Sequence, residues 1–252
     1  MKTRKHLLPL MSVLLAATVM TSCQQMLQKL TSKAMEMTEN FEKEDTTKWG
    51  PVVERDLDVP AFTAIDAKGA VRIVYTQDTL PSLRLRGNER CLSDYQFEVR
   101  KGTLKLQPKD FSGSVNGKTA SVTLLVSAPV LTKVEVSGAG RLDMPSPVVL
   151  AESLSVEMEG AAQVNVTDLT VPALTLEIEG AGKCTIDRVS SEGDIDIEMD
   201  GAADLKAHVL CQELSVELNG AGNAVLSGEC KHLNCEENGA AKVDSSALSI
   251  KP

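Results

Sequence analysis

The chain has 252 residues and a formal net charge of −9, with 42% hydrophobic and 3% aromatic residues. This length and apolar content suffice for one sizeable core or two small ones. The acidic balance argues against nucleic acid as a partner, because binding to phosphates depends on Lys and Arg.

Residues 1–22 have the features of a bacterial export signal. Basic residues within the first five positions precede an apolar run from Leu7 to Met20, which small residues follow. This order of charge, apolar run and small residues is typical of a signal peptide. The run is short and contains Pro9, so it is a poor membrane-spanning helix.

The segment Val19–Cys23 resembles the lipobox of bacterial lipoproteins. The resemblance implies cleavage before Cys23 and lipidation, including palmitate, of its thiol and new amino group. The alternative is an ordinary secretory signal with a chance cysteine. Gln24 and Gln25 follow without an acidic cluster. This favours an inward-facing anchor, and a cell-surface anchor is the alternative.

Residues 23–51 are expected to form a lipidated tether. They are largely polar, with apolar residues at helical spacing between Leu27 and Phe41. A short helix and a flexible tether fit this pattern equally well. Either would hold a folded domain off the membrane.

From residue 52 the pattern changes to the period-two alternation of β-strands. Runs such as Val71–Tyr75 and Val122–Val126 are separated by Gly, Pro, Asn and Asp, which are typical of turns. Residues 52–133 are therefore expected to be an irregular first half built from strands. Within it, Gly69-Ala70 is a loose forerunner of a glycine motif that recurs in the second half.

Residues 134–245 contain six copies of one unit, each centred on a Gly-Ala-(Gly/Ala) triplet. The triplets recur every 19 to 22 residues and begin at Gly138, Gly160, Gly180, Gly201, Gly220 and Gly239. Positions two and four before the glycine are apolar in nearly every copy and alternate with polar ones, which predicts strands with one buried face. The glycine is expected at a tight corner with positive φ.

A helix-free unit of about 20 residues is one coil of a solenoid, in which each coil buries its apolar face only by stacking on its neighbours. The predicted fold is all-β, a right-handed parallel β-helix or β-solenoid. An antiparallel sandwich is the competing architecture. The sixth copy carries Glu237 in a core position, as expected of a terminal unit that faces water.

The repeats and several motifs before them resemble the putative auto-transporter adhesin, head GIN domain family. The motifs are Pro60–Ile65, Val71–Ile73, Gly102–Leu104, Ala128–Leu131 and Val136–Gly140. The resemblance covers residues 52–245 and leaves residues 246–252 as a tail. It implies one continuous β-helical domain in the cell envelope with a role in adhesion, and it supplies no catalytic residues.

Two outward-facing columns of the repeat are acidic. Three residues before the glycine stand Glu135, Glu157, Glu177, Glu198, Glu217 and Glu236. One residue before it stand Ser137, Glu159, Glu179, Asp200, Asn219 and Asn238. Stacked carboxylates repel by roughly 1 kcal/mol per pair even in a water-like dielectric, so a compensating partner is expected.

Calcium is one such partner, because it prefers several oxygen ligands. Its expected ligands are Glu157, Glu159, Glu177, Glu179, Glu198 and Asp200. Ion pairs with Arg141, Lys183 and Lys242, which lie three residues after their glycines, are another answer. A solvated face screened by salt and a basic protein partner remain alternatives.

Five cysteines remain if Cys23 is lipidated. Cys211 and Cys230 each lie ten residues after a repeat glycine, so they should stack on adjacent coils at a separation suited to a disulfide. Cys184 and Cys235 occupy core columns, where cysteine acts as a small apolar residue.

The sequence favours a protein that is not an enzyme. Among the histidines only His208 and His232 lie beyond the leader, and no nucleophile-elbow, metalloprotease or phosphate-loop motif is present.

The expected function is structural or adhesive binding of an envelope protein or glycan by a lipoprotein of the outer membrane, on its periplasmic or cell-surface face. A polysaccharide-processing β-helix enzyme is the alternative, although the repeats contain no aromatic residue to stack on sugars. An accessory component of an envelope-stress system is a third interpretation.

Overall fold

The computed structural model describes residues 50–109 and 121–251. The expected leader, Cys23 and the tether as far as residue 49 lie outside this part of the chain. Strands dominate the described residues, and no helix among them has the length and apolar character needed to cross a membrane.

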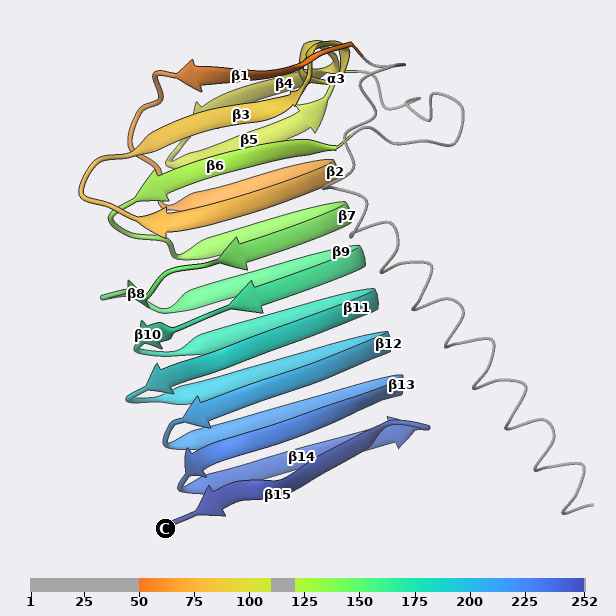
Figure 1. Ribbon diagram of the computed structural model, residues 1–252. Coiled ribbons are helices and arrows are strands. Elements are labelled where there is room, and N and C mark those ends of the chain that lie inside the picture. Colours follow the sequence, from red (N-terminus) through yellow and green to blue (C-terminus); the bar gives the residue numbers. More distant parts are fainter. Residues whose placement is uncertain (1–49, 110–120, 252) are drawn as a thin grey trace, which may run out of the picture.

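The six repeats form successive coils of one stack (Figure 1). Each repeat strand pairs in parallel with the strand of the next repeat, and the register aligns the glycines from Gly138 to Gly239. The strands are β7 (Lys133–Met144), β9 (Leu154–Val166), β11 (Leu174–Ser191), β12 (Asp194–Leu210), β13 (Glu213–Cys230) and β14 (His232–Gly239). The predicted right-handed parallel β-solenoid is confirmed, and the parallel ladders exclude an antiparallel sandwich.

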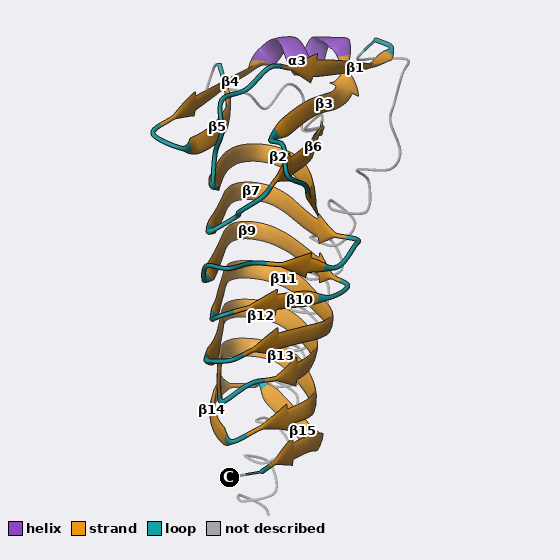
Figure 2. Cartoon of the chain, turned by 90° about the vertical axis from the view of Figure 1, so that its left-hand side faces the viewer, coloured by secondary structure: helices purple, strands orange, loops and turns teal. Residues whose placement is uncertain are grey.

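Each long strand folds back on itself at its glycine, at the right-hand edge of Figure 1. The part before the glycine is called here the first limb, and the part after it the second limb. In the last coil the second limb is a separate strand, β15 (Lys242–Ile250), which pairs with β13. Two short strands, β8 (Val148–Val149) and β10 (Leu169–Val171), extend the upper coils, and β10 pairs with both β8 and β11. Figure 2 shows the coils from the side, one below another.

The corner position requires glycine for two physical reasons. Gly201 has a φ of 116°, which a side chain rarely permits. A Cβ atom at Gly201 would also lie 2.1 Å from the carbonyl oxygen of Gly180 in the coil above, closer than any real contact. The corner glycine therefore sets both the fold-back and the close stacking of adjacent coils.

The interior between the two limbs is filled by aligned columns of apolar side chains. One fully buried column of the first limb consists of Val134, Val156, Leu176, Ile197 and Val216. Burial of such side chains supplies most of the favourable free energy of folding. The apolar positions predicted from the repeat are therefore the core.

A seventh coil lies above β7, within the stretch that was expected to be irregular. It is β2 (Ala64–Gln77), whose Gly69 is aligned with Gly138. Above β2, two separate strands take the place of a further coil: β5 (Thr103–Pro108) stacks on the first limb and β6 (Val122–Ala128) on the second.

Antiparallel strands then close this end of the stack. They are β4 (Tyr95–Arg100) on β5, β3 (Ser82–Asn88) on β6, and β1 (Val52–Leu57) on β3. The short helix α3 (Glu89–Asp94) joins β3 to β4 and buries Cys91 and Leu92. This group of β1, β3, β4, β5, β6 and α3 is called the N-terminal cap below.

Candidate binding face

The outward side of the first limbs carries a continuous column of glutamates. Register pairs Glu135 with Glu157, and the alignment continues through Glu177, Glu198 and Glu217 to Glu236. This set is called the glutamate column. It forms because a parallel ladder stacks identical positions of successive coils about 4.8 Å apart, so the sequence repeat becomes a row of like charges.

A lysine neutralises the part of the column nearest the N-terminal cap. The Nζ atom of Lys133 lies 2.9 Å from Oε1 of Glu135 and 3.0 Å from Oε1 of Glu157. Hydrogen bonds to both carboxylates raise the pKa of Lys133, and the hydrogen bond from Lys133 is the main reason that the pKa of Glu157 is lowered. The sequence reasoning overlooked Lys133.

Further along the column, desolvation and neighbouring negative charges disfavour the ionisation of the glutamates. Desolvation, followed by the negative charges of Glu157 and Glu179, raises the pKa of Glu177. Desolvation, followed by the charges of Glu217 and Asp200, raises the pKa of Glu198. The middle of the glutamate column is therefore a region of excess negative potential on the surface.

The column changes character again at the C-terminal coils. The amide of Asn219 donates to Oε1 of Glu217 at 2.8 Å, and the amide of Asn238 donates to Oδ1 of Asn219 at 2.8 Å. Each amide donates a hydrogen bond without adding charge. The repulsion between carboxylates is therefore weakened where asparagines replace the acidic residues one position before the corner glycine.

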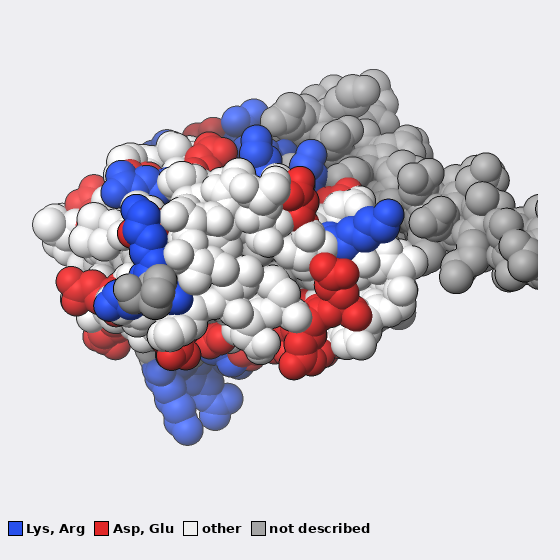
Figure 3. Space-filling view, turned by 90° about the horizontal axis from the view of Figure 1, so that it is seen from below, with Lys and Arg blue, Asp and Glu red and all other residues white. Residues whose placement is uncertain are grey.

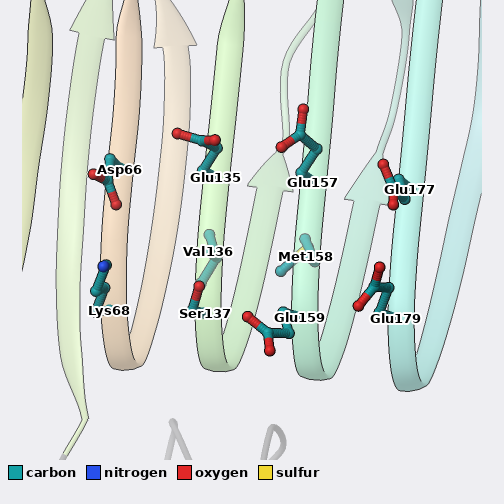
Figure 4. A pocket seen from close by; sticks show the side chains of 10 residues that line it. All are labelled: Asp66, Lys68, Glu135, Val136, Ser137, Glu157, Met158, Glu159, Glu177 and Glu179. Carbon is teal, nitrogen blue, oxygen red and sulfur yellow. The ribbon is translucent and has the colours of Figure 1, made fainter.

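A shallow groove of about 350 Å³ runs along the upper part of this face. Figure 4 shows carboxylates from three successive coils around it, with Asp66 and Lys68 at one end. Besides Asp66, its acidic lining is made by Glu135, Glu157, Glu159, Glu177 and Glu179. No aromatic ring lines it in the part of the chain that the structure describes, which agrees poorly with a sugar-stacking cleft.

The calcium site predicted on this face stays a prediction. The six expected ligands do share the face, since Glu157, Glu177 and Glu198 are aligned and Glu159, Glu179 and Asp200 are aligned beside them. However, among the described residues no group of three or more His, Cys, Asp or Glu is arranged to hold a metal ion. A calcium titration followed by thermal melting tests the hypothesis, and a melting temperature that stays constant at millimolar calcium would contradict it.

The ion pair expected between Arg141 and the glutamate column is wrong. Arg141 lies beyond the corner, on the second limb, where its Nε atom is 2.9 Å from the carboxylate of Asp143. Asp143 is buried and also accepts hydrogen bonds from Arg72 at 2.7 Å and Asn165 at 2.7 Å. This network joins three coils on the opposite side of the solenoid, so its role is to hold the stack together.

The two cysteines predicted to form a disulfide lie on adjacent coils. Strand β12 pairs with β13 as far as Leu210 and Glu229, one residue before Cys211 and Cys230 respectively. Both are free thiols in this structure, as are Cys91, Cys184 and Cys235. Cys184 lies in the core as expected. The core position predicted for Cys235 is wrong: this cysteine is exposed, because among the described strands β14 stacks on β13 from one side only.

One Ser–His contact was not foreseen. Nδ1 of His208 lies 3.1 Å from the hydroxyl of Ser227 on the next coil, and that hydroxyl also lies 3.3 Å from the carbonyl oxygen of Ala207. Neither residue belongs to the lining of the acidic groove. With its hydroxyl directed to a backbone carbonyl, Ser227 is not arranged as a nucleophile activated by His208.

The fold and this face define the class of protein: a parallel β-solenoid that presents a repeated, acidic outer surface. The family model described as "Putative auto-transporter adhesin, head GIN domain" matches residues 61–188 and 169–251. These matches together cover most of the chain, which therefore belongs to this family. Two overlapping matches are what a repeat produces, because one model fits successive coils.

Solved structures share the fold at low sequence identity. A putative adhesin from Bacteroides fragilis is 20% identical, with a TM-score of 0.60 over 79% of this chain and 97% of the other. A putative adhesin from Parabacteroides merdae is 14% identical, with a TM-score of 0.52 over 77% and 97%. A putative lipid binding protein from Parabacteroides distasonis is 18% identical, with a TM-score of 0.50 over 77% and 97%. No curated protein matches the chain.

Proposed function

We propose that this protein is a non-catalytic, lipid-anchored binding protein of the bacterial outer membrane, with an adhesive or structural role. The glutamate column is the observation that carries the proposal. It is an array of carboxylates at a fixed spacing, and among the described residues no lysine pairs with its middle as Lys133 pairs with the capped end. A regular array suits binding to an extended or repeating partner better than it suits turnover of one small substrate.

Charge complementarity indicates the chemistry of the partner. Desolvation, followed by repulsion from neighbouring carboxylates, raises the pKa values of Glu177 and Glu198, and a cationic group placed beside them would relieve that repulsion. The proposed partner is therefore an envelope protein with a basic surface, or a glycan that carries positively charged groups. Family membership supports the adhesive role, since the family and several relatives of the same fold are described as adhesins.

Lipidation at Cys23 is the proposed means of attachment, supported by the lipobox-like segment before it. The test is mass spectrometry of the protein from a bacterial membrane fraction. We expect a mature chain that begins at Cys23 and carries acyl groups, and we expect Cys23→Ser to remain unacylated and leave the membrane fraction. A mature chain without acyl groups would refute the anchor.

The binding role is tested separately by a pair of charge-matched variants. Glu177→Gln with Glu198→Gln removes two charges from the glutamate column, and Asp187→Asn with Glu192→Gln removes two exposed charges away from it. Binding to immobilised poly-lysine and to purified outer-membrane vesicles is measured at low and high salt. We expect the first variant to lose most of its binding and the control to keep it. Equal binding by both variants would contradict the proposed face.

A further inference from the structure

The strand register continues through the two cysteines near the C-terminal end. The backbone N–H of Cys211 donates to the carbonyl oxygen of Glu229 at 3.1 Å. In a parallel ladder this bond is the one made when Cys211 lies directly opposite the residue after Glu229, which is Cys230. The two residues therefore stack as equivalent positions of adjacent coils.

Both side chains belong to one inward-facing column. Register aligns Val171 with Ser191, and it aligns Cys230 with Ile250 in the coil below. Val171, Ser191 and Cys230 are buried, and Cys211 packs against the core from a less buried position. Adjacent strands lie about 4.8 Å apart, which falls within the Cα separations of 4.4–6.8 Å or so that disulfides span.

A disulfide here requires the two Cβ atoms to move slightly closer together than strand spacing places them. Cβ atoms of a disulfide are about 3.5–4.5 Å apart, slightly closer than strand spacing alone provides. Cys211 lies just beyond the end of β12 (Asp194–Leu210), at the connection to β13. Its backbone is therefore less constrained than that of a residue within a ladder.

We propose that Cys211 and Cys230 are joined by a disulfide in the mature protein. The bond fastens the coil that ends at Cys230 to the coil above it, close to the end of the stack that carries no cap. It is independent of the proposed binding face, because the cysteines point into the interior while the glutamate column points outward.

The reaction is a thiol–disulfide exchange with a low-molecular-weight or protein disulfide as the oxidant. The less buried Cys211 attacks the oxidant as a thiolate, forms a mixed disulfide and releases one thiol. The sulfur of Cys230 then attacks the sulfur of Cys211 and releases the second thiol. The protein loses two electrons and two protons, and the oxidant gains both.

The reaction is expected to be slow. Burial, followed by the proximity of Cys230, raises the pKa of Cys211 to about 12, and burial also raises the pKa of Cys230. Little thiolate is present at neutral pH, so formation is favoured by long residence in an oxidising compartment such as the bacterial envelope.

Cys235 is the competing partner. It lies on the first limb of the last coil, aligned with the buried Val216, and is itself exposed. Its electrostatic interaction with Cys230 indicates that the two are neighbours. Cys211 is preferred because it shares a column and a ladder position with Cys230, which Cys235 does not.

Peptide mapping distinguishes these pairings. The full chain is incubated with oxidised glutathione, free thiols are alkylated, and the protein is cut with trypsin together with a Glu-specific protease. Cuts after Glu213, Glu229 and Lys231 place Cys211, Cys230 and Cys235 on separate peptides. We expect the Cys211 peptide to be linked to the Cys230 peptide while Cys235 is alkylated. A Cys230–Cys235 link, or complete alkylation of all three, would overturn the proposal.

Thermal melting provides a second readout that requires no variant. Adding a reductant to the oxidised wild-type chain should lower the melting temperature by about 5–10 °C, the effect expected of a bond that closes a loop of this length. Cys211→Ser should abolish this sensitivity, and the matched control Cys235→Ser should retain it. An identical response to reductant in both variants would contradict the assignment.

Discussion

The two ends of the solenoid are closed by different means. At the N-terminal end the strands reverse direction, and the cap buries aromatic residues such as Tyr75 and Tyr95. The Tyr75 hydroxyl donates to the carbonyl oxygen of Ala128 at 2.8 Å, which ties β2 to the cap. A change of strand direction stops the ladder of parallel coils and covers its core.

At the C-terminal end the repeat simply becomes polar. Glu237 stands opposite the buried Leu218 of the coil above, and its Oε1 accepts a hydrogen bond from the backbone N–H of Val243 at 2.9 Å. In Figure 3, which looks onto this end, uncharged side chains occupy much of the centre and charged ones lie mainly around them. A solenoid can therefore end either with an added group of strands or with polar residues at the core positions of its last coil.

The largest contrast is expected between a corner within the stack and the corner at its open end. Gly201→Ala forces a positive-φ residue and a Cβ into a corner that has coils on both sides. It should lower the free energy of unfolding by about 3 kcal/mol or more. A Cβ at Gly239 would lie 2.5 Å from the carbonyl oxygen of Gly220, but Gly239 belongs to the last described coil, which can shift away from the contact, so Gly239→Ala should cost about half as much. Urea denaturation measures both, and equal losses would show that the open end is as constrained as the middle.

A similar contrast is expected for core leucines. Leu124 in the N-terminal cap is fully buried, whereas Leu233 in the last coil is only partly buried. Leu124→Ala should cost about 3 kcal/mol and Leu233→Ala about 1 kcal/mol, because the cavity and the lost burial are smaller at an exposed edge. The same denaturation experiment checks this, and a greater loss at Leu233 would contradict the idea that the open end contributes less.

The polar residues of the last coil are expected to prevent self-association rather than to stabilise the fold. Glu237→Leu restores an apolar core residue at the exposed edge, so the unfolding free energy should change by less than about 1 kcal/mol. Self-association should increase, because an uncovered apolar edge strand pairs readily with another. Sedimentation velocity at several concentrations measures this, with Glu237→Gln as the polar control. Unchanged sedimentation of Glu237→Leu would contradict this role for Glu237.

The sequence predicted the coils and the open end far better than the N-terminal cap. Repetition defines the register directly, because each column from Gly138 to Gly239 repeats its chemistry. The N-terminal cap has no sequence repeat that would define its register. Its pairs join residues far apart in the chain, such as Ser82 with Ser127, and a period-two pattern does not distinguish parallel from antiparallel neighbours.

The sequence predicted that the glutamates align on one face, but it did not predict their ion pairs or their pKa shifts. Partners for the glutamates were sought three residues after the glycine, where Arg141 lies beyond the corner and pairs with Asp143. The correct partner, Lys133, stands two residues before Glu135. Strand alternation puts positions two apart on the same face, so that signal was present in the sequence. The desolvation around Glu177 and Glu198 depends on neighbouring coils and required the structure.

The smallest expected effects concern the pH dependence of stability. They differ between the end of the glutamate column near the N-terminal cap and its middle. Glu177 and Glu198 have pKa values raised above the usual 4.5, so the folded state binds more protons than the unfolded state just above that pH. Their contribution to the free energy of unfolding is fully present below pH 4.5 and is lost as the pH rises through the raised pKa values. Glu157, next to Lys133, has a lowered pKa and the opposite behaviour: its contribution is present above pH 4.5 and is lost as the pH falls through the lowered value.

At pH 7, neutralising the two kinds of glutamate should therefore have opposite effects on the melting temperature. Glu177→Gln removes a charge that is disfavoured by desolvation and by repulsion, and it should raise the melting temperature slightly, whereas Glu157→Gln removes the ion pair with Lys133 and should lower it slightly. Both shifts should shrink in high salt, because these side chains are partly solvated and exposed charges are screened. At pH 4, which lies below the usual pKa of 4.5 and further below the raised one, Glu177 is mostly protonated in both states, so most of the gain from Glu177→Gln should disappear. A gain that persists at pH 4 would mean that the substitution acts through packing, and the excess negative potential inferred for the middle of the column would then lose its support.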